Sequence, residues 1–288
     1  STRVRSSAAS DVYKRQLKNR FMKQLKLMVL TLTLLMGTMF TSCMDSGESG
    51  PQQWAGVVKV NDRMGYVTFT DAAGTELIPT NTIPVTLNAR MAYIYCQVDE
   101  GQDLSTNPKS IKITLLADPT GIDATAITTP KVGESGDVTT NAPVGSLSFV
   151  SGYSTVAPFQ FSENTIVLPV LYRVKNVTTT EDIKNELAKH TFTLVCYTDD
   201  IKSGDTILKL YLRYKVEDEP AAIAERATRT SSFKAYEISQ ILREYTLKSG
   251  QTKPAKITIV AQQNEYNNKL EDTSTIEKVY EIEYKTAE

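Results

Sequence analysis

Alternation of apolar and polar side chains is the feature that most limits how this chain can fold. In Thr206–Val216, every second residue from Leu208 onward is apolar or tyrosine, and polar side chains or Tyr211 stand between them. Ser274–Lys285 repeats the pattern, with Tyr280, Ile282 and Tyr284 alternating with Glu281, Glu283 and Lys285. A period of two belongs to a strand with one face on a core and the other in water. The chain is therefore expected to be mostly antiparallel β structure.

The first half of the pattern predicts a small barrel. Five short runs of strand-forming residues follow one another closely: Trp54–Val60, Met64–Thr70, Thr75–Pro79, Arg90–Val98 and Ser110–Leu116. No convincing helical period interrupts them. Five short strands in so few residues favour a partly open barrel of the OB type. A segment rich in Thr, Gly, Pro and Asp follows at residues 119–144 and is predicted to be a linker or long surface loop.

The second half predicts a β-sandwich with one or two short helices. The expected strands are Ser146–Gly152, Thr165–Val174, His190–Asp199, Thr206–Val216, Ser232–Ile238, Ala255–Gln262 and Ser274–Lys285. Thr178 and Glu181 have the spacing of a capping box, and Ile183 and Leu187 would share one face of that helix before Lys189. A second helix is expected at Ser239–Lys248, ending at Gly250, and Pro220–Thr228 is a further short helical segment.

The N-terminal region has the order of a lipoprotein export signal. Lys23 and Lys26 precede an apolar run of about 14 residues, which is too short for a membrane-spanning helix. Small residues and Cys43 end that run, so cleavage after Ser42 and acylation of Cys43 are expected. Two or three acyl chains would anchor the protein stably in a membrane. The motif resembles the relaxed cleavage signal of a phylum of Gram-negative gut anaerobes, which implies the bacterial outer membrane, on the cell surface or the periplasmic face.

These patterns divide the chain into six parts. The predicted parts are a non-native leader at 1–21, a signal peptide at 22–42, a tether at 43–53, an OB-like domain at 54–118, the linker at 119–144 and a sandwich domain at 145–288.

The charge balance argues against a nucleic-acid partner. Residues 1–42 hold eight of the 32 basic residues and one of the 33 acidic residues, so 24 basic and 32 acidic residues follow. The resulting formal charge of −8, without a basic run, is unsuited to neutralising phosphates.

The remaining cysteines are expected to be structural. Cys96 alternates in phase with Ile94 and Val98, and Cys196 is in phase with Leu194. A free cysteine on an apolar strand face behaves as a small hydrophobic residue. Both are predicted to be buried, reduced and unpaired.

The motifs of common enzymes are missing from the sequence. His190 is the only histidine, and it lies between a predicted helix and a strand, where a cation is mildly stabilising. Zinc sites and nucleophile–base pairs generally need histidine with a partner. No cofactor, metal or catalytic residue is predicted, and the protein is interpreted as a non-enzyme. A glycosidase that uses only two carboxylates stays open as an alternative, because its spacing is invisible in sequence.

A few surface features could bind or carry a ligand. Three carboxylates, Asp199, Asp200 and Asp205, flank the predicted hairpin loop Ile201–Gly204. They lack the spacing of an EF-hand calcium loop, and a polar turn between two strands accounts for them without an ion. Asp205-Thr206-Ile207 resembles an O-glycosylation motif of the same bacterial phylum, which makes Thr206 a candidate. Trp54 and Tyr66 lie in the predicted barrel strands and are the candidate ligand contacts, by analogy with OB-folds that bind oligosaccharides.

The order of features resembles the NigD-like lipoproteins. Gly65–Asn81, Arg90–Val98 and Ser110–Leu116 are similar to the N-terminal OB-like domain of that family, and Asn164–Asn176, Lys189–Asp200 and Asp205–Val216 are similar to its C-terminal sandwich. The resemblance implies a fold and the lipidated Cys43, and no catalytic residue.

The leading hypothesis is a non-enzymatic outer-membrane lipoprotein with a binding or structural role, whose partner is a glycan or a protein. The alternatives are a surface polysaccharide-processing enzyme and, from the family name, a protein associated with bacteriocin production or immunity.

Overall fold

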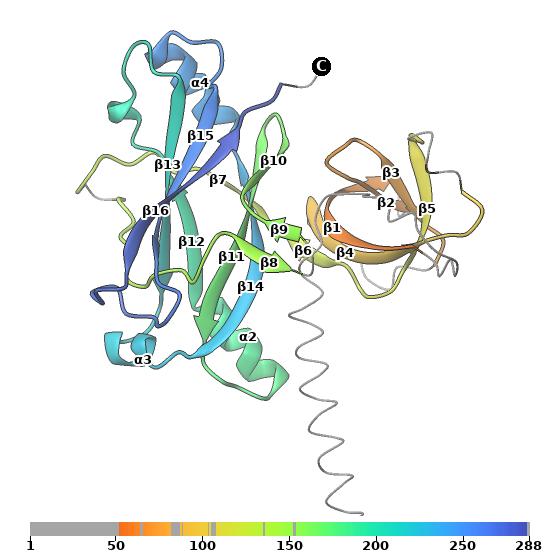
Figure 1. Ribbon diagram of the computed structural model, residues 1–288, viewed down its shortest axis with the longest axis horizontal. Helices are drawn as coiled ribbons and strands as arrows, with labels where there is room; N and C mark the ends of the chain where they lie inside the picture. Colours follow the sequence, from red (N-terminus) through yellow and green to blue (C-terminus); the bar gives the residue numbers. More distant parts are fainter. Residues whose placement is uncertain are drawn as a thin grey trace, which may run out of the picture.

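The computed structural model describes residues 52–63, 66–81, 87, 89–102, 104, 108–134, 136–151 and 154–286. The protein is all-β, as predicted, with a closed barrel, further sheets and three short helices in the described residues. Figure 1 shows the barrel beside the sandwich, with β6, β8 and β9 between them.

The barrel has the strand order β1-β2-β3-β5-β4, closed by pairing of β4 with β1. Its strands are β1 (Gln53–Arg63), β2 (Tyr66–Thr70), β3 (Glu76–Pro79), β4 (Met91–Val98) and β5 (Ser110–Leu115). All but the β3–β5 pair are antiparallel. Alternate residues such as Val58, Phe69 and Ile94 fill the interior and are fully buried. The period of two seen in the sequence therefore closes on itself to form a core.

The sandwich consists of two four-stranded sheets. The first has the order β10-β11-β14-β7 and the second β12-β13-β15-β16. Their strands are β7 (Ala124–Ala126), β10 (Phe159–Ser162), β11 (Thr165–Val174), β12 (His190–Val195), β13 (Ile207–Val216), β14 (Thr228–Glu237), β15 (Lys256–Gln263) and β16 (Ile276–Glu283). The largest core lies between the sheets and includes Leu168, Leu210 and Ile259. A separate hairpin pairs β8 (Phe149–Ser151) with β9 (Ser154–Val156).

The segment expected as a linker, residues 119–144, is built into both parts of the molecule. β6 (Thr120–Ile122) pairs with β4 of the barrel, and β7 pairs in parallel with β14 of the sandwich. Asp123 alone separates the two strands. Further along, the Asn141 side chain bonds both the amide and the carbonyl of Val216. The segment also places Ile122 in the core between barrel and sandwich, and Ile127 and Val144 in the sandwich core. These apolar residues are too widely spaced to give a periodic pattern in the sequence.

Three helices join strands: α2 (Thr180–Ala188), α3 (Pro220–Ala224) and α4 (Ser239–Ser249). Gly250 ends α4 in the left-handed conformation, as predicted. The cap of α2 differs from the prediction by one residue, because Thr179 accepts the Asp182 amide. The buried residue of α2 is Glu186, whereas Leu187 is 43% exposed. The helix is therefore held by the ionic contact of Glu186, and Leu187 on the face that it shares with Ile183 is exposed.

Candidate functional site

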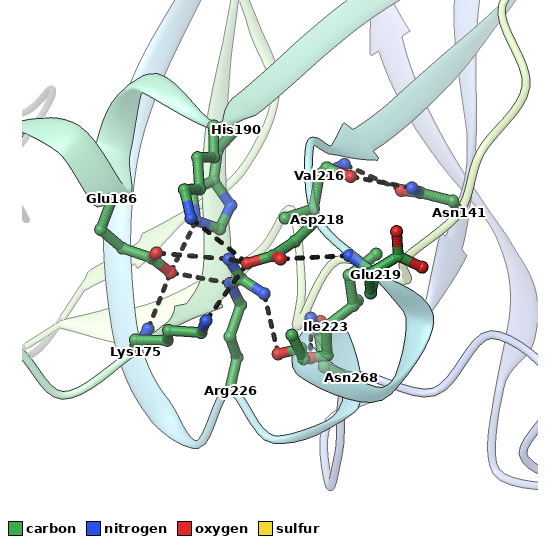
Figure 2. A network of polar contacts seen from close by, with 12 residues as sticks. Asn141, Lys175, Glu186, His190, Val216, Asp218, Glu219, Ile223, Arg226 and Asn268 are labelled. Carbon is green, nitrogen blue, oxygen red and sulfur yellow. Dashed lines mark hydrogen bonds and ion pairs between the residues drawn. The ribbon is translucent and has the colours of Figure 1, made fainter.

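A buried ionic network surrounds Arg226, shown in Figure 2. The Arg226 Nε donates to Glu186 Oε1 at 2.7 Å, and Nη2 lies 3.0 Å from Asp218 Oδ2. Lys175 and Lys189 reach the same Asp218 oxygen at 3.2 and 3.3 Å. The network joins α2, the end of β11 and the segment around α3.

His190 belongs to this network and is a neutral, buried side chain. Its Nδ1 lies 2.7 Å from the Tyr214 hydroxyl, and its Nε2 lies 3.3 Å from Glu186 Oε1. Burial lowers the pKa of His190, and the Glu186 carboxylate offsets this only in part because Arg226 and Lys234 oppose it. The expectation of a stabilising cation at a helix end is therefore corrected: Arg226, and not His190, is the counterion of Glu186.

The Glu186 carboxyl stays ionised. Burial alone would raise its pKa, but hydrogen bonds from the Lys175 amide and from Arg226 outweigh burial, and the pKa lies below its usual value. The side chains of Arg226 and His190 are 0% and 1% exposed. Because the Arg226, Glu186 and His190 side chains bond one another and are shielded from solvent, the buried part of the network is an element of stability.

An open hollow lies on the outward face of the second sandwich sheet. It has a volume of about 520 Å³ and is bordered by side chains of β13, β15 and the loop before β13. The aromatic members are Tyr197 and Tyr211, and the polar members include Asp200, Asp205 and Lys209. The outward position of Lys209 and Tyr211 follows from the leucines on the other side of β13, which fill the core.

The two tyrosines are held by a row of cation–aromatic contacts. The Tyr197 and Tyr211 rings meet edge to face, with centroids 5.2 Å apart. The Arg213 guanidinium lies 5.1 Å from the Tyr211 centroid and 5.7 Å from that of Tyr197. Lys209 lies 5.0 Å from the Tyr211 centroid. Such contacts fix long side chains in place, so the surface is organised before any ligand arrives.

A second hollow of about 410 Å³ shares Tyr197 with the first. Its other borders include Asp137, Thr140, Arg213 and Gln262. Tyr197 donates to Asp137 Oδ1 at 2.8 Å and accepts from Arg213 Nη2 at 2.9 Å. A hydrogen bond from the Gly133 amide, together with that from Tyr197, lowers the pKa of Asp137. We call the two hollows together the Tyr197 groove.

The predicted ligand contacts of the barrel lie apart from each other. Trp54 packs against the barrel core, and its ring covers Gly56, where a Cβ would approach within 2.6 Å. Tyr66 is 56% exposed and pairs with Arg63 at the far end of β1. Trp54 thus lies on the row that faces the barrel core, and Tyr66 is directed to solvent, so the two aromatic side chains do not form one exposed contact face.

Other predicted residues have clear positions. Thr206 is exposed and borders the first hollow. Cys96 and Cys196 are buried, free thiols in separate cores, as predicted, and burial raises the pKa of each to about 12. Ser42 and Cys43 lie outside the described residues. In the part of the chain that the structure describes, no cluster of three potential metal ligands occurs, and no helix has the length and apolar character needed to cross a membrane.

The sequence reasoning missed Tyr197, Tyr211 and Arg213 as site residues. The alternation of β13 places Tyr211 and Arg213 together on the outward face of the strand, and this pattern could have identified them as candidate contact residues. Asp137 carried no comparable signal, because it lies 60 residues before Tyr197 in the chain and only the fold joins them.

Two solved structures of Bacteroides proteins are similar to this chain. A provisionally assigned lipoprotein from Bacteroides fragilis NCTC 9343 is 97% identical, with a TM-score of 0.77, over 82% of this chain and 100% of that chain. This chain belongs to the same family as that lipoprotein. A protein of unknown function from Bacteroides vulgatus ATCC 8482 is 11% identical, with a TM-score of 0.51, over 81% of this chain and 92% of that chain, and shares the fold alone. No family model and no curated protein matches the chain.

Proposed function

We propose that the protein is a lipid-anchored envelope protein that binds a glycan through the Tyr197 groove and catalyses no reaction. The proposal rests on the groups that border one hollow. Two tyrosine rings with centroids 5.2 Å apart lie there beside carboxylate, ammonium and hydroxyl groups. Binding sites for small ligands commonly combine an apolar wall with a few polar groups that fix orientation.

The chemistry of the groove suits a sugar. A pyranose ring has an apolar C–H surface, which packs on aromatic rings, and hydroxyl groups that both donate and accept hydrogen bonds. Asp200 and Asp205 offer acceptors, Lys209 offers donors, and the Thr258 side chain offers both. The mixed charge of these residues favours a neutral sugar over nucleic acid, since phosphate recognition needs an excess of positive charge.

The anchor is proposed from the sequence and from the relative. Cleavage after Ser42 and acylation of Cys43 follow from the order of basic, apolar and small residues, and a 97% identical protein is provisionally assigned as a lipoprotein. We place the protein at the outer membrane. Intact-mass analysis of membrane-extracted protein should find an acylated Cys43 as the first residue. Release of a Cys43→Ala variant from membranes would support the anchor, and unchanged membrane association would contradict it.

The domain division and the family name are part of the same proposal. We infer an OB-like domain that ends near Asp123 and a sandwich domain that begins there, since strands on either side of this residue join different sheets. The resemblance to NigD-like lipoproteins is kept as the proposed family name. That name also suggests a role in bacteriocin production or immunity, but no residue of the Tyr197 groove supports such a role.

O-glycosylation of Thr206 and glycan binding in the Tyr197 groove exclude each other. The exposed side chain of Thr206 borders the groove, so an O-linked sugar there would occupy the space of a bound glycan. Peptide mass spectrometry of protein from its native host decides whether Thr206 is modified.

A glycan array with the mature protein tests the proposed binding. We expect reproducible binding of a neutral oligosaccharide by the wild-type protein and by Tyr66→Ala, and weaker binding by Tyr211→Ala. Tyr66 is the matched control, because it is an exposed tyrosine on the barrel. Absence of binding to every glycan would contradict the proposal.

The enzyme alternative rests on Asp200 and Asp205, which border the same hollow. A glycosidase would need both carboxylates at opposite sides of the scissile bond. Incubation of the glycan found on the array with wild-type protein and with Asp200→Asn or Asp205→Asn separates the two functions. We expect an intact glycan in every case, and cleavage that both substitutions abolish would establish the enzyme.

A further inference from the structure

Two arginines face each other on neighbouring strands of the first sandwich sheet. Arg173 of β11 and Arg229 of β14 are direct partners in the antiparallel register. Both guanidinium groups donate to the same acceptor, the backbone carbonyl of Glu265, and the Arg229 bond measures 2.6 Å. Side chains directly opposite each other on one face of a sheet are close neighbours, and like charges in this position repel.

The pair has no acidic partner among the described residues. The ion pairs of this part of the chain include neither Arg173 nor Arg229 within 4.0 Å of a carboxylate. The carboxylate of Glu265 instead accepts a hydrogen bond from Gln263 at 3.0 Å. Two positive groups therefore converge on one neutral oxygen.

Burial makes this arrangement more costly. Arg173 is only 5% exposed, and its Nε has no hydrogen-bond partner. Burial lowers the pKa of Arg173, and the neighbouring Arg229 lowers it further. Arg229 is exposed and presents its remaining donors to solvent. A buried charge is normally paired, and arginine prefers planar oxyanions that take two hydrogen bonds.

We propose that Arg173 and Arg229 form a binding site for an oxyanion, a carboxylate, sulfate or phosphate group, that is separate from the Tyr197 groove. The anion neutralises the pair and receives the outer donors of Arg229, while Arg173 supplies a fixed positive charge beneath it. The site does not depend on glycan binding in the groove.

Thermal unfolding in sulfate tests the site. Sodium sulfate is titrated against sodium chloride at constant ionic strength, with wild-type protein, Arg229→Gln and Arg243→Gln. Arg243 is the matched control, since it is an exposed arginine on α4. A ligand that binds only the folded state raises the melting temperature in a saturable way.

We expect a saturable rise of several degrees for wild-type protein and for Arg243→Gln, and a flat response for Arg229→Gln. An equal rise in all three proteins would reflect general stabilisation by sulfate, an adventitious ion only, and would overturn the proposal. A flat response of the wild-type protein would overturn it as well. Arg173→Lys keeps the charge without the planar fork and should show a smaller rise.

Competition identifies the source of the anion. Phosphatidylglycerol vesicles, with phosphatidylcholine vesicles as control, test a lipid headgroup. Oligogalacturonate, with its methyl ester as control, tests an acidic sugar. Competition with sulfate by one of these probes assigns the source, and competition by neither assigns an inorganic anion.

Discussion

The rings of Tyr93 and Phe233 stack across the contact between barrel and sandwich, with centroids 5.5 Å apart and planes inclined by 14°. Tyr93 lies on β4 and Phe233 on β14, and each is 6% exposed. They belong to a third apolar core, which also includes Val57, Met91 and Val167. The outer face of β1 and β4 is thereby covered by the sandwich, so the two parts are joined by packing as well as by the chain.

Replacing Phe233 with alanine should weaken this joint. Loss of a buried phenylalanine costs about 3–5 kcal/mol. A double-mutant cycle with Tyr93→Ala should give a coupling energy of about 0.5–1.5 kcal/mol for the ring pair. Trp54 is the only tryptophan and reports on the barrel, while circular dichroism reports on all strands. In urea the two signals should coincide for the wild-type protein and for each variant, so that every member of the cycle has one free energy of unfolding. A coupling energy of zero would show that the rings do not join the two parts.

The Glu186–Arg226 contact should be essential for stability. Glu186→Gln removes the more deeply buried of the two carboxylates that pair with Arg226, the other being Asp218, and breaking a buried pair on one side costs about 3–5 kcal/mol. Asp199→Asn is the control, because it breaks the exposed ion pair with Lys248 and should leave the free energy of unfolding unchanged. Similar urea midpoints for Glu186→Gln and wild-type protein would contradict the role of the network.

Acid should destabilise the protein through His190. Its pKa in the folded state lies below the ordinary value of 6.5, so the unfolded state binds more protons as the pH falls. The contribution to stability is present above pH 6.5 and is lost as the pH falls from there toward the lowered pKa. The slope reaches at most about 1.4 kcal/mol per pH unit for one proton. The unfolding free energy, measured between about pH 8 and 5, should fall less steeply in His190→Gln than in wild-type protein. A wild-type stability that rises toward pH 5 would contradict a neutral His190.

The two buried thiols should be inert in the folded protein. Burial raises the pKa of Cys96 and Cys196 to about 12, and the thiolate is the reactive form. A maleimide reagent should label neither cysteine in native buffer at neutral pH and both in denaturant, as counted by mass spectrometry. Rapid labelling of either one before unfolding would show that its strand face is exposed.

Most strands could be predicted because their chemistry is local. β11 begins and ends at the predicted residues, Thr165 and Val174, since its apolar side chains are continuous between polar turns. The leucines of β13 fixed which face of that strand is buried. Local pattern is sufficient wherever a strand has one core face.

The differences arise where contacts are long-range. β6 and β7 have three residues each, too few to show an alternating pattern, and they form by pairing with the edges of β4 and β14. α2 buries Glu186 because the side chain pairs with the buried Arg226. Arg226 lies 40 residues later in the chain, so this contact leaves no local pattern in the sequence. The Tyr197 groove likewise depends on Asp137 and on strands β13 and β15, which the sequence alone does not place side by side.

The most direct test of the central claim is to locate a bound glycan. Titration calorimetry with the neutral oligosaccharide that binds most strongly should compare wild-type protein with Tyr211→Ala, Tyr197→Phe and Tyr66→Ala. We predict at least a tenfold loss of affinity, about 1.4 kcal/mol, for Tyr211→Ala, since truncating a tyrosine at the centre of a binding surface commonly costs this much or more. Tyr197→Phe should lose part of the affinity, because it releases Asp137 and Arg213 from the shared hydroxyl. Tyr66→Ala should bind as wild type. Undiminished binding by both groove variants, with loss in Tyr66→Ala, would place the site on the barrel and contradict the account.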